Sequence, residues 1–131
     1  MAAAESITYA LLSGVAGGRV YPVIRPQAGT LPAVVTTLIS IVADGVLDQT
    51  AGPNLYRARV QADCFASTYA ALKTLVDEVR AAVHLKSGYY AGYLVVSSVM
   101  DVVAGDDVDL DTGIYSQAVD FLIIYYDQMG D

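Results

Sequence analysis

A change in hydrophobic period midway along the chain predicts its core. Between Leu55 and Cys64, apolar and polar side chains alternate, which is the period of two expected of a half-buried β-strand. Beyond Ser67 or Thr68, either of which can cap a helix, apolar residues recur every three or four positions as far as Val83. We therefore expect a strand that leads directly into an amphipathic helix, with their apolar sides buried against each other.

The remaining pattern predicts one further helix and three further strands. A short helix is expected over residues 4–13, where a glycine-rich segment ends it. Strands are expected over residues 33–43, 89–100 and 114–126, which are rich in β-branched or aromatic side chains. Residues 44–54, with two glycines and a proline, are expected to form a long hairpin loop.

These elements predict a single α+β domain over residues 1–131. The order helix, strand, strand, helix, strand, strand gives a four-stranded mixed or antiparallel sheet of two long hairpins, with two helices packed mainly on one face. Strands of eleven residues or more exceed the usual length of about five or six, so we expect the hairpins to project beyond the core. Unpaired edges on projecting hairpins favour coverage by neighbouring subunits.

The composition is that of a globular protein, with 55% hydrophobic and 16% charged residues. The longest apolar stretch, residues 31–43, is interrupted by polar side chains, so we expect no membrane span. The first six residues lack the basic start and apolar run of a secretory signal, so we also expect no export. The one cysteine, Cys64, excludes an intrachain disulfide and fits a reducing cytoplasm.

The chain is acidic, with a net charge of −7 from fourteen acidic and seven basic residues. This balance argues against a partner held through phosphates, because such binding depends on clustered cations. Ten tyrosines and a high apolar content instead favour a protein that covers part of its surface with copies of itself or with a partner.

No constellation of catalytic or metal-binding residues is evident in the sequence. His84 is the only histidine and is expected at a helix C-terminus, where a cation interacts favourably with the helix dipole. Cys64 lies on the apolar face of its strand and is expected to be a packed core thiol. Gly14, Gly17 and Gly18 follow a helix, whereas a phosphate-binding loop follows a strand. We therefore expect a protein that is not an enzyme and holds no cofactor or metal.

An acidic loop over residues 101–113 is the strongest candidate for chemistry. Asp107, Asp109 and Asp111 alternate as the first three ligands of a calcium loop do. The pattern then fails, because a threonine stands where the sharp turn needs glycine and an alanine where the bidentate glutamate is required. A solvated or interface loop is the favoured interpretation, and a weak cation site is the alternative.

Four polar residues share one face of the strand that begins at Leu55. They are Arg57, Arg59, Gln61 and Asp63. Two interpretations remain open: a solvated face, or a subunit interface with ion pairs across it. Two arginines alone do not make a nucleic-acid patch.

Short segments spread over nearly the whole chain resemble one protein family. The segments are Gly-Arg-Val-Tyr-Pro at 18–22, Leu-Pro-Ala-Val at 31–34, Arg-Val-Gln-Ala-Asp-Cys-Phe at 59–65, Asp-Thr-Gly-Ile-Tyr at 111–115 and Val-Asp-Phe at 119–121. Their order and spacing are similar to those of the small tail completion proteins, or tail terminators, of long-tailed bacteriophages and prophages.

This resemblance implies a structural virion protein without catalytic residues. Such proteins form a ring, commonly of six copies, on the head-proximal end of the tail tube; the ring ends tube growth and offers the surface to which the filled head attaches. The implied partners are further copies of the chain, the tail tube protein and a head-tail connector protein, in a tail assembled in the host cytoplasm.

DNA would pass through such a ring without specific binding. A channel wall that carries carboxylates repels phosphates. We therefore hypothesise that some of Asp106, Asp107, Asp109 and Asp111 face the lumen.

Two alternatives differ in what they would require. A head-side connector or neck protein has a similar size and occupies a neighbouring ring, so its location on purified heads or tails would distinguish it. A small cytoplasmic ligand-binding or enzymatic domain needs a pocket with convergent polar groups, and the sequence suggests none.

Overall fold

The computed structural model describes residues 3–22, 30–43 and 55–129. Within these ranges two α-helices, one short 3-10 helix and seven strands follow one another. They are α1 (Ala3–Leu11), η1 (Val15–Gly18), β1 (Val20–Pro22), β2 (Ala33–Ala43), β3 (Leu55–Ala66), α2 (Tyr69–Val83), β4 (Lys86–Tyr90), β5 (Tyr93–Val103), β6 (Asp107–Asp109) and β7 (Ile114–Met129).

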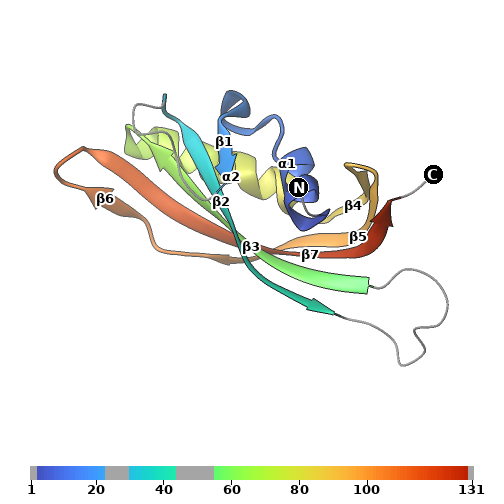
Figure 1. The fold of residues 1–131 in the computed structure, drawn as a ribbon. Coiled ribbons are helices and arrows are strands. Elements are labelled where there is room, and N and C mark those ends of the chain that lie inside the picture. Colours follow the sequence, from blue (N-terminus) through green and yellow to red (C-terminus); the bar gives the residue numbers. More distant parts are fainter. Residues whose placement is uncertain (1–2, 23–29, 44–54, 130–131) are drawn as a thin grey trace.

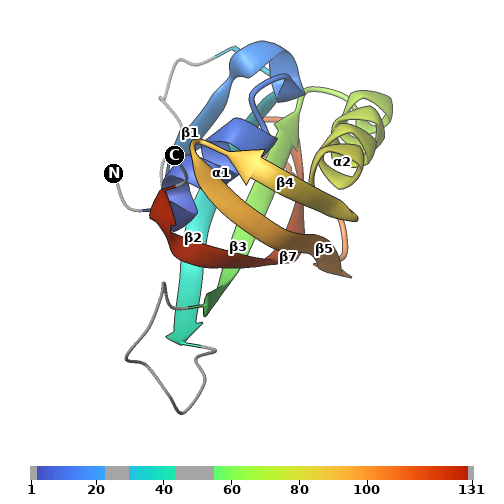
Figure 2. The ribbon, with the colours of Figure 1, turned by 90° about the vertical axis from the view of Figure 1, so that its right-hand side faces the viewer.

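All seven strands belong to one mixed sheet. Its order is β1-β2-β3-β7-β5-β4, and β6 pairs with β7 outside this path. The β1–β2 pair is parallel and the other pairs are antiparallel. The helices lie on the same side of the sheet (Figure 1), and the sheet curls around them as a half-barrel (Figure 2).

The expectation of a four-stranded sheet is wrong, because the sheet has three further strands that the sequence pattern does not reveal. The strand expected over residues 89–100 is in fact two, β4 and β5, which a turn at Ala91 and Gly92 separates. These residues have φ values of 54° and 85°, and positive φ at both central residues gives the tight turn of a two-residue hairpin. The strands β1 and β6 have three residues each, too few for a period to be detected.

The first predicted hairpin is present as expected. β2 runs over Ala33–Ala43, as the sequence predicts, and pairs antiparallel with β3. The loop expected to connect them, residues 44–54, lies outside the described residues. β7 pairs with β3 on one side and with β5 on the other, so it is the central strand that joins the two halves of the sheet.

The core lies between α2, α1 and the concave face of the sheet. Alternate residues of β3 from Ala58 to Ala66 are buried, and they face a stripe of buried residues on α2. That stripe consists of Leu72, Leu75, Val76, Val79 and Val83. Phe121 and Ile123 of β7 are fully buried in the same cluster. This is the strand-helix core that the change of period predicts.

Cys64 lies inside this core and has no disulfide partner. Burial, with smaller contributions from Asp63 and Glu78, raises the pKa of the Cys64 thiol to about 12. The thiolate is the reactive form of cysteine, so this side chain is an inert core residue, as its position on the apolar face of the strand predicts.

Local hydrogen bonds fix the helix positions. The N-cap of α2 is Thr68, whose Oγ1 accepts a hydrogen bond from the N–H of Ala71 at 3.1 Å. The structure thus decides between the two cap candidates. On α1, the Tyr9 hydroxyl donates to the carbonyl of Val20 at 2.9 Å and holds the helix beside β1. Neither helix in the described ranges is both long and apolar enough to cross a lipid bilayer.

Candidate assembly interface

One arm of the molecule is the far end of β2 and β3. The first three residues of β2 are buried and its last five are exposed, among them the apolar Ile39, Ile41 and Val42. The register shifts between Leu38 and Ser40, so a bulge separates the covered half of the strand from the exposed half. This end of the hairpin extends away from both helices (Figure 1).

The second arm is the hairpin of β6 and the first part of β7, at the opposite end of the sheet in Figure 1. The acidic segment is therefore partly a strand rather than a loop, because β6 pairs with Ile114 to Ser116 of β7. The N–H of Gly113 donates to the carbonyl of Asp109 at 2.7 Å and closes the turn. Leu110 at the tip is 90% exposed. The arm therefore presents an apolar side chain beside its carboxylates.

The carboxylates of this arm have different surroundings. Asp107, Asp109 and Asp111 are exposed, and Oδ1 of Asp109 accepts a hydrogen bond from the N–H of Asp111 at 2.9 Å. In the described part of the chain, no three His, Cys, Asp or Glu side chains are grouped so as to hold a metal ion. The described residues therefore supply no group of ligands for the alternative interpretation, a weak cation site.

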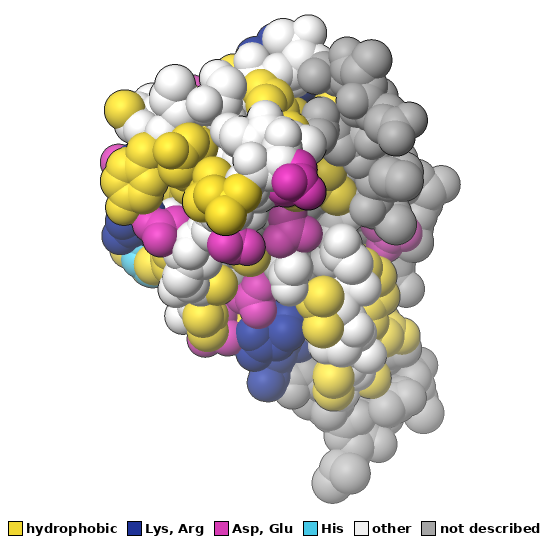
Figure 3. Space-filling view, turned by 90° about the vertical axis from the view of Figure 1, so that its left-hand side faces the viewer, with side chains coloured by type: hydrophobic (Ala, Val, Ile, Leu, Met, Phe, Trp, Pro, Cys, Tyr) yellow, Lys and Arg dark blue, Asp and Glu magenta, His cyan; other side chains and the backbone are white. Residues whose placement is uncertain are grey.

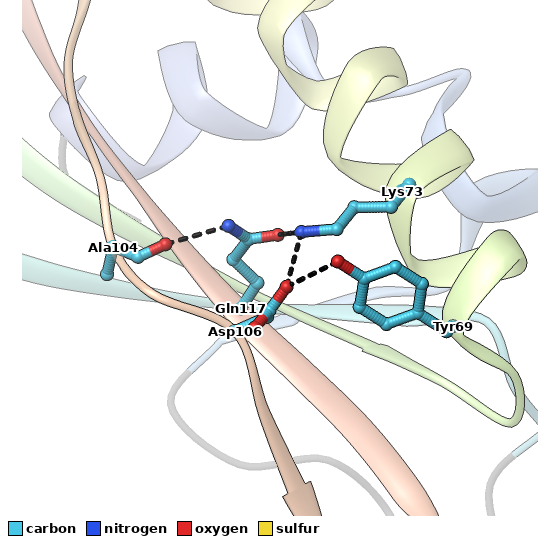
Figure 4. Close-up of polar contacts among 5 residues, drawn as sticks. All are labelled: Tyr69, Lys73, Ala104, Asp106 and Gln117. Atoms are coloured by element: carbon cyan, nitrogen blue, oxygen red, sulfur yellow. Dashed lines mark hydrogen bonds and ion pairs between the residues drawn. The ribbon is translucent and has the colours of Figure 1, made fainter.

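Asp106, by contrast, is bound to α2 within the chain (Figure 4). Its Oδ2 lies 2.7 Å from Nζ of Lys73 and accepts a hydrogen bond from the Tyr69 hydroxyl at 2.9 Å. Hydrogen bonds from Lys73 and then from Tyr69 hold the pKa of Asp106 below its ordinary value, and the same carboxylate raises the pKa of Lys73. Asp106 therefore differs from the three exposed aspartates with which the sequence groups it.

Gln117 completes this network. Its Oε1 accepts a hydrogen bond from Nζ of Lys73 at 2.9 Å, and its Nε2 donates to the carbonyl of Ala104 at 2.7 Å. Together these contacts fasten the segment between β5 and β6 to the first turns of α2 and to β7. The sequence does not single out Tyr69, Lys73 or Gln117 as members of a site. The only signal for a shared role is the i,i+4 spacing of Tyr69 and Lys73 on the solvent-facing side of the helix.

The convex face of the sheet carries the four polar residues of β3. Nη1 of Arg59 lies 2.6 Å from Oδ2 of Asp101 on β5 and 3.8 Å from Oδ2 of Asp120 on β7. Nε2 of Gln61 donates to Oδ1 of Asp63 at 2.9 Å. Arg59 thus has acidic partners within its own chain, and the subunit-interface interpretation of this face remains a prediction.

Hydrophobic side chains are exposed beside charged ones on one side of the molecule. Viewed from the β6 side, acidic side chains lie above and to the left of a central basic patch, with hydrophobic side chains on either side of it (Figure 3). Val102 on β5 and Val42 on β2, each about half exposed, contribute to the apolar surface of the arms and their neighbourhood. Neither described helix covers the convex face, because both pack on the opposite one (Figure 1).

His84 lies at the C-terminus of α2, as expected, and also contacts the sheet. Its Nδ1 accepts a hydrogen bond from the N–H of Met100 at 3.2 Å. His84 therefore links the end of α2 to β5, and its favourable interaction with the helix dipole stays a prediction.

Comparisons with known proteins give a likeness of fold but not of sequence family. No protein-family model matches the chain, and no curated protein matches it. Among solved structures, a chain of the "Virion of native gene transfer agent (GTA) particle" has a similar fold, with a TM-score of 0.59 and 14% sequence identity. The match covers 94% of this chain and 96% of that chain. The likeness therefore concerns nearly the whole length of the fold.

Proposed function

We propose that this chain is a structural virion protein of a tailed, phage-like particle. The observation that carries the proposal is the end-to-end match with a chain of a gene transfer agent virion, which leaves only a few per cent of either chain unmatched. A shared fold alone does not define function. The two projecting arms and the resemblance of the sequence segments to tail completion proteins point in the same direction.

Within the particle, we propose a ring at the head-proximal end of the tail tube. There the ring would end the polymerisation of the tube protein and present a surface to the head-tail connector protein. Contacts between unlike surfaces of identical subunits generate a ring when the rotation closes. The exposed apolar end of β2 and the acidic arm lie at opposite ends of the sheet, so each could meet a different surface of a neighbour.

This role needs no catalysis. Subunits act by position, and the acidic arm would contribute carboxylates to the wall of the channel. Asp107, Asp109 and Asp111 are the residues available for this, because Asp106 is bound to Lys73. Phosphates that pass such a wall are repelled rather than bound.

A tail assembly reaction tests the proposal. Purified tube protein is polymerised with and without this chain, and tube lengths are measured in negative-stain images. We expect tubes of defined length when the chain is present and overlong tubes when it is absent. Equal length distributions in the two reactions would contradict a terminator role.

Purified tails and purified tail-less heads distinguish the two neighbouring ring positions. We label the chain with an antibody and expect the label on the tails, at the end that joins the head. Label on tail-less heads would instead assign the chain to the head-side connector or neck.

A further inference from the structure

A pocket lies between α1 and β2, on the side of the sheet that carries the helices. Its volume is about 330 Å³, and its lining includes Glu5 and Tyr9 of α1, Pro22 at the end of β1, residues 36–38 of β2 and Val60 of β3. Pockets that hold small ligands begin at about this size, which is ample for one aliphatic side chain. The lining is mostly apolar, with Glu5 as its one charged residue.

The carboxylate of Glu5 lacks a partner. Its Oε1 is buried and has no hydrogen-bond partner in the described part of the chain. Nor does the carboxylate form an ion pair with any residue that the structure describes. A buried acceptor without a partner is unfavourable. A cation brought to this carboxylate would therefore be bound favourably.

The turn between α2 and β4 presents an exposed leucine. Leu85 is 75% exposed and has a φ of 57°, a left-handed conformation that is uncommon for residues other than glycine. Oγ of Ser98 donates to the carbonyl of Val83 at 2.7 Å just before this turn. The N–H of Met100 donates to Nδ1 of His84 at 3.2 Å within it. Because these contacts hold the turn against β5, the leucine is presented with little conformational freedom to lose on binding.

The residue after this leucine is a cation without a described partner. Lys86 forms no hydrogen bond or ion pair with a described residue, whereas Arg59, Lys73 and Arg80 each pair with an aspartate. Lys86 is paired across the sheet with the buried Ser98, so the two side chains lie on the same face, the one that carries the helices. The cation and the pocket therefore lie on the same side of the sheet.

We infer that Leu85 of one copy of this chain inserts into the α1–β2 pocket of the next copy. The leucine fills the apolar space, and the ammonium of Lys86 pairs with the carboxylate of Glu5. β4 is at one end of the strand order and β2 is near the other, and Figure 2 shows α2 and β2 on opposite sides of the molecule. The contact therefore joins unlike surfaces head-to-tail and can close a ring. The inference deepens the proposed ring and rests on it.

Other exposed apolar residues fit the pocket less well. Leu85, Tyr89 and Leu110 are the most exposed large apolar side chains among the described residues. Tyr89 alternates with Tyr90, which packs against the core, so Tyr89 points to the convex face, away from the pocket. Leu110 stands between two aspartates, which the carboxylate of Glu5 would repel. Leu85 alone of the three adjoins a lysine.

Photo-crosslinking tests the contact directly. Leu85 is replaced by p-benzoylphenylalanine, the protein is irradiated in isolation and on tail tubes, and crosslinked peptides are identified by mass spectrometry. We expect intermolecular crosslinks to residues 3–9 and 36–38. A variant with the same probe at Leu110 serves as the control and should not crosslink to those residues. Crosslinks from position 85 only to other regions, or none between copies, would overturn the inference.

Association measurements test the leucine. By light scattering, Leu85→Gly should weaken association about tenfold to hundredfold, because the pocket loses a buried leucine. Folding should be unaffected, since glycine adopts this φ freely, and circular dichroism checks it. Ala91→Gly makes the same backbone change in another exposed turn with positive φ and should leave association unchanged. Equal association of Leu85→Gly and the wild type would contradict the insertion.

A double-mutant cycle tests the ion pair. Glu5→Gln and Lys86→Gln should each weaken association about fivefold. The double variant should be no weaker than either single variant, because all three lose the same contact. If the double variant instead shows the product of the two single losses, the side chains do not meet and the inference fails.

Tube length separates this inference from the proposed function. If Leu85→Gly assembles like the wild type and still ends tube growth, the inference fails and the proposed function stands. If position 85 crosslinks to the pocket but the chain never changes tube length, the function fails and the contact stands.

Discussion

Lys73 on α2 and Asp106 ahead of β6 are 33 positions apart in sequence, yet Nζ of the lysine lies 2.7 Å from Oδ2 of the aspartate. This ion pair joins the helix that covers the core to the base of the acidic arm. The Tyr69 hydroxyl and Gln117 reinforce it from either side. A small polar cluster at the surface therefore attaches the base of the acidic arm to α2, in addition to the pairing of β6 with β7.

The ion pair predicts how the arm responds to acid. Because the pKa of Asp106 is lower in the folded chain than its ordinary value of 3.8, the pair contributes its stability above that value. The contribution is lost as the pH falls through the depressed pKa. We expect hydrogen exchange over residues 104–110 to stay slow from neutral pH down to about pH 4 and to accelerate below it, relative to the intrinsic rate.

The variant Asp106→Asn tests the same ion pair by mutation. It should accelerate exchange in the same segment already at neutral pH and remove the acid dependence, with little change in the global melting temperature, because exposed ion pairs contribute little to overall stability. Asp77→Asn on the exposed face of α2 serves as the control. Equal protection of residues 104–110 in the Asp106 variant and the wild type would show that the ion pair does not hold the arm.

The helix cap gives a second prediction. Thr68→Ala removes the hydroxyl that accepts from the N–H of Ala71, so it should lower the free energy of unfolding by about 1 kcal/mol. Ser67→Ala, at the neighbouring exposed position, should change it by less than about 0.5 kcal/mol. Urea unfolding followed by circular dichroism measures both. A larger loss for Ser67 than for Thr68 would contradict the cap assignment.

The hydrophobic core gives a third prediction. Phe121 is fully buried on the central strand, between β3 and β5, and contributes to the cluster beneath α2. Phe121→Ala should lower the free energy of unfolding by about 3–5 kcal/mol, since it removes apolar contacts and leaves a cavity. Leu110→Ala, at the exposed tip of the arm, should cost less than about 0.5 kcal/mol. Similar urea midpoints for the two variants would show that β7 is not central to the core.

The sequence predicts those parts of the fold that repeat a simple period. The alternation predicts β3, and the spacing of three and four residues predicts α2. The bounds of β2 are predicted correctly because its run of β-branched residues ends at glycine- and proline-rich segments. The hairpin turn at Ala91 and Gly92 was missed, because alanine rarely adopts positive φ and gives no turn signal. β6 was missed for a different reason: three residues held in place by pairing with β7 have no local signature.

The candidate site shows the same limit. The sequence identifies the acidic segment but groups Asp106 with Asp107, Asp109 and Asp111, since all four are alike in composition. Only tertiary structure brings Lys73 to one of them and leaves the other three exposed. A pocket between α1 and β2 is equally invisible in the sequence, because its lining comes from four elements, α1, β1, β2 and β3, whose contact depends on how the sheet curls.

The exposed carboxylates give the last prediction. Replacing Asp107, Asp109 and Asp111 together by asparagine removes three charges per subunit from the acidic arm but leaves the Lys73–Asp106 pair intact. If these side chains line the channel, loss of their repulsion should let the phosphates of DNA bind the wall and slow DNA ejection by about tenfold. Ejection followed with a DNA-binding dye in assembled particles measures this.

The control variant for this prediction loses acidic charges on α2 instead of on the acidic arm. Asp77→Asn combined with Glu78→Gln neutralises two exposed acids on α2 and should leave ejection unchanged. Tail numbers in electron micrographs confirm that both variants assemble. Normal ejection and titre in the triple variant would remove the arm from the channel wall. A rise in melting temperature on addition of calcium, present in the wild type and absent in the triple variant, would instead assign the three aspartates to a cation.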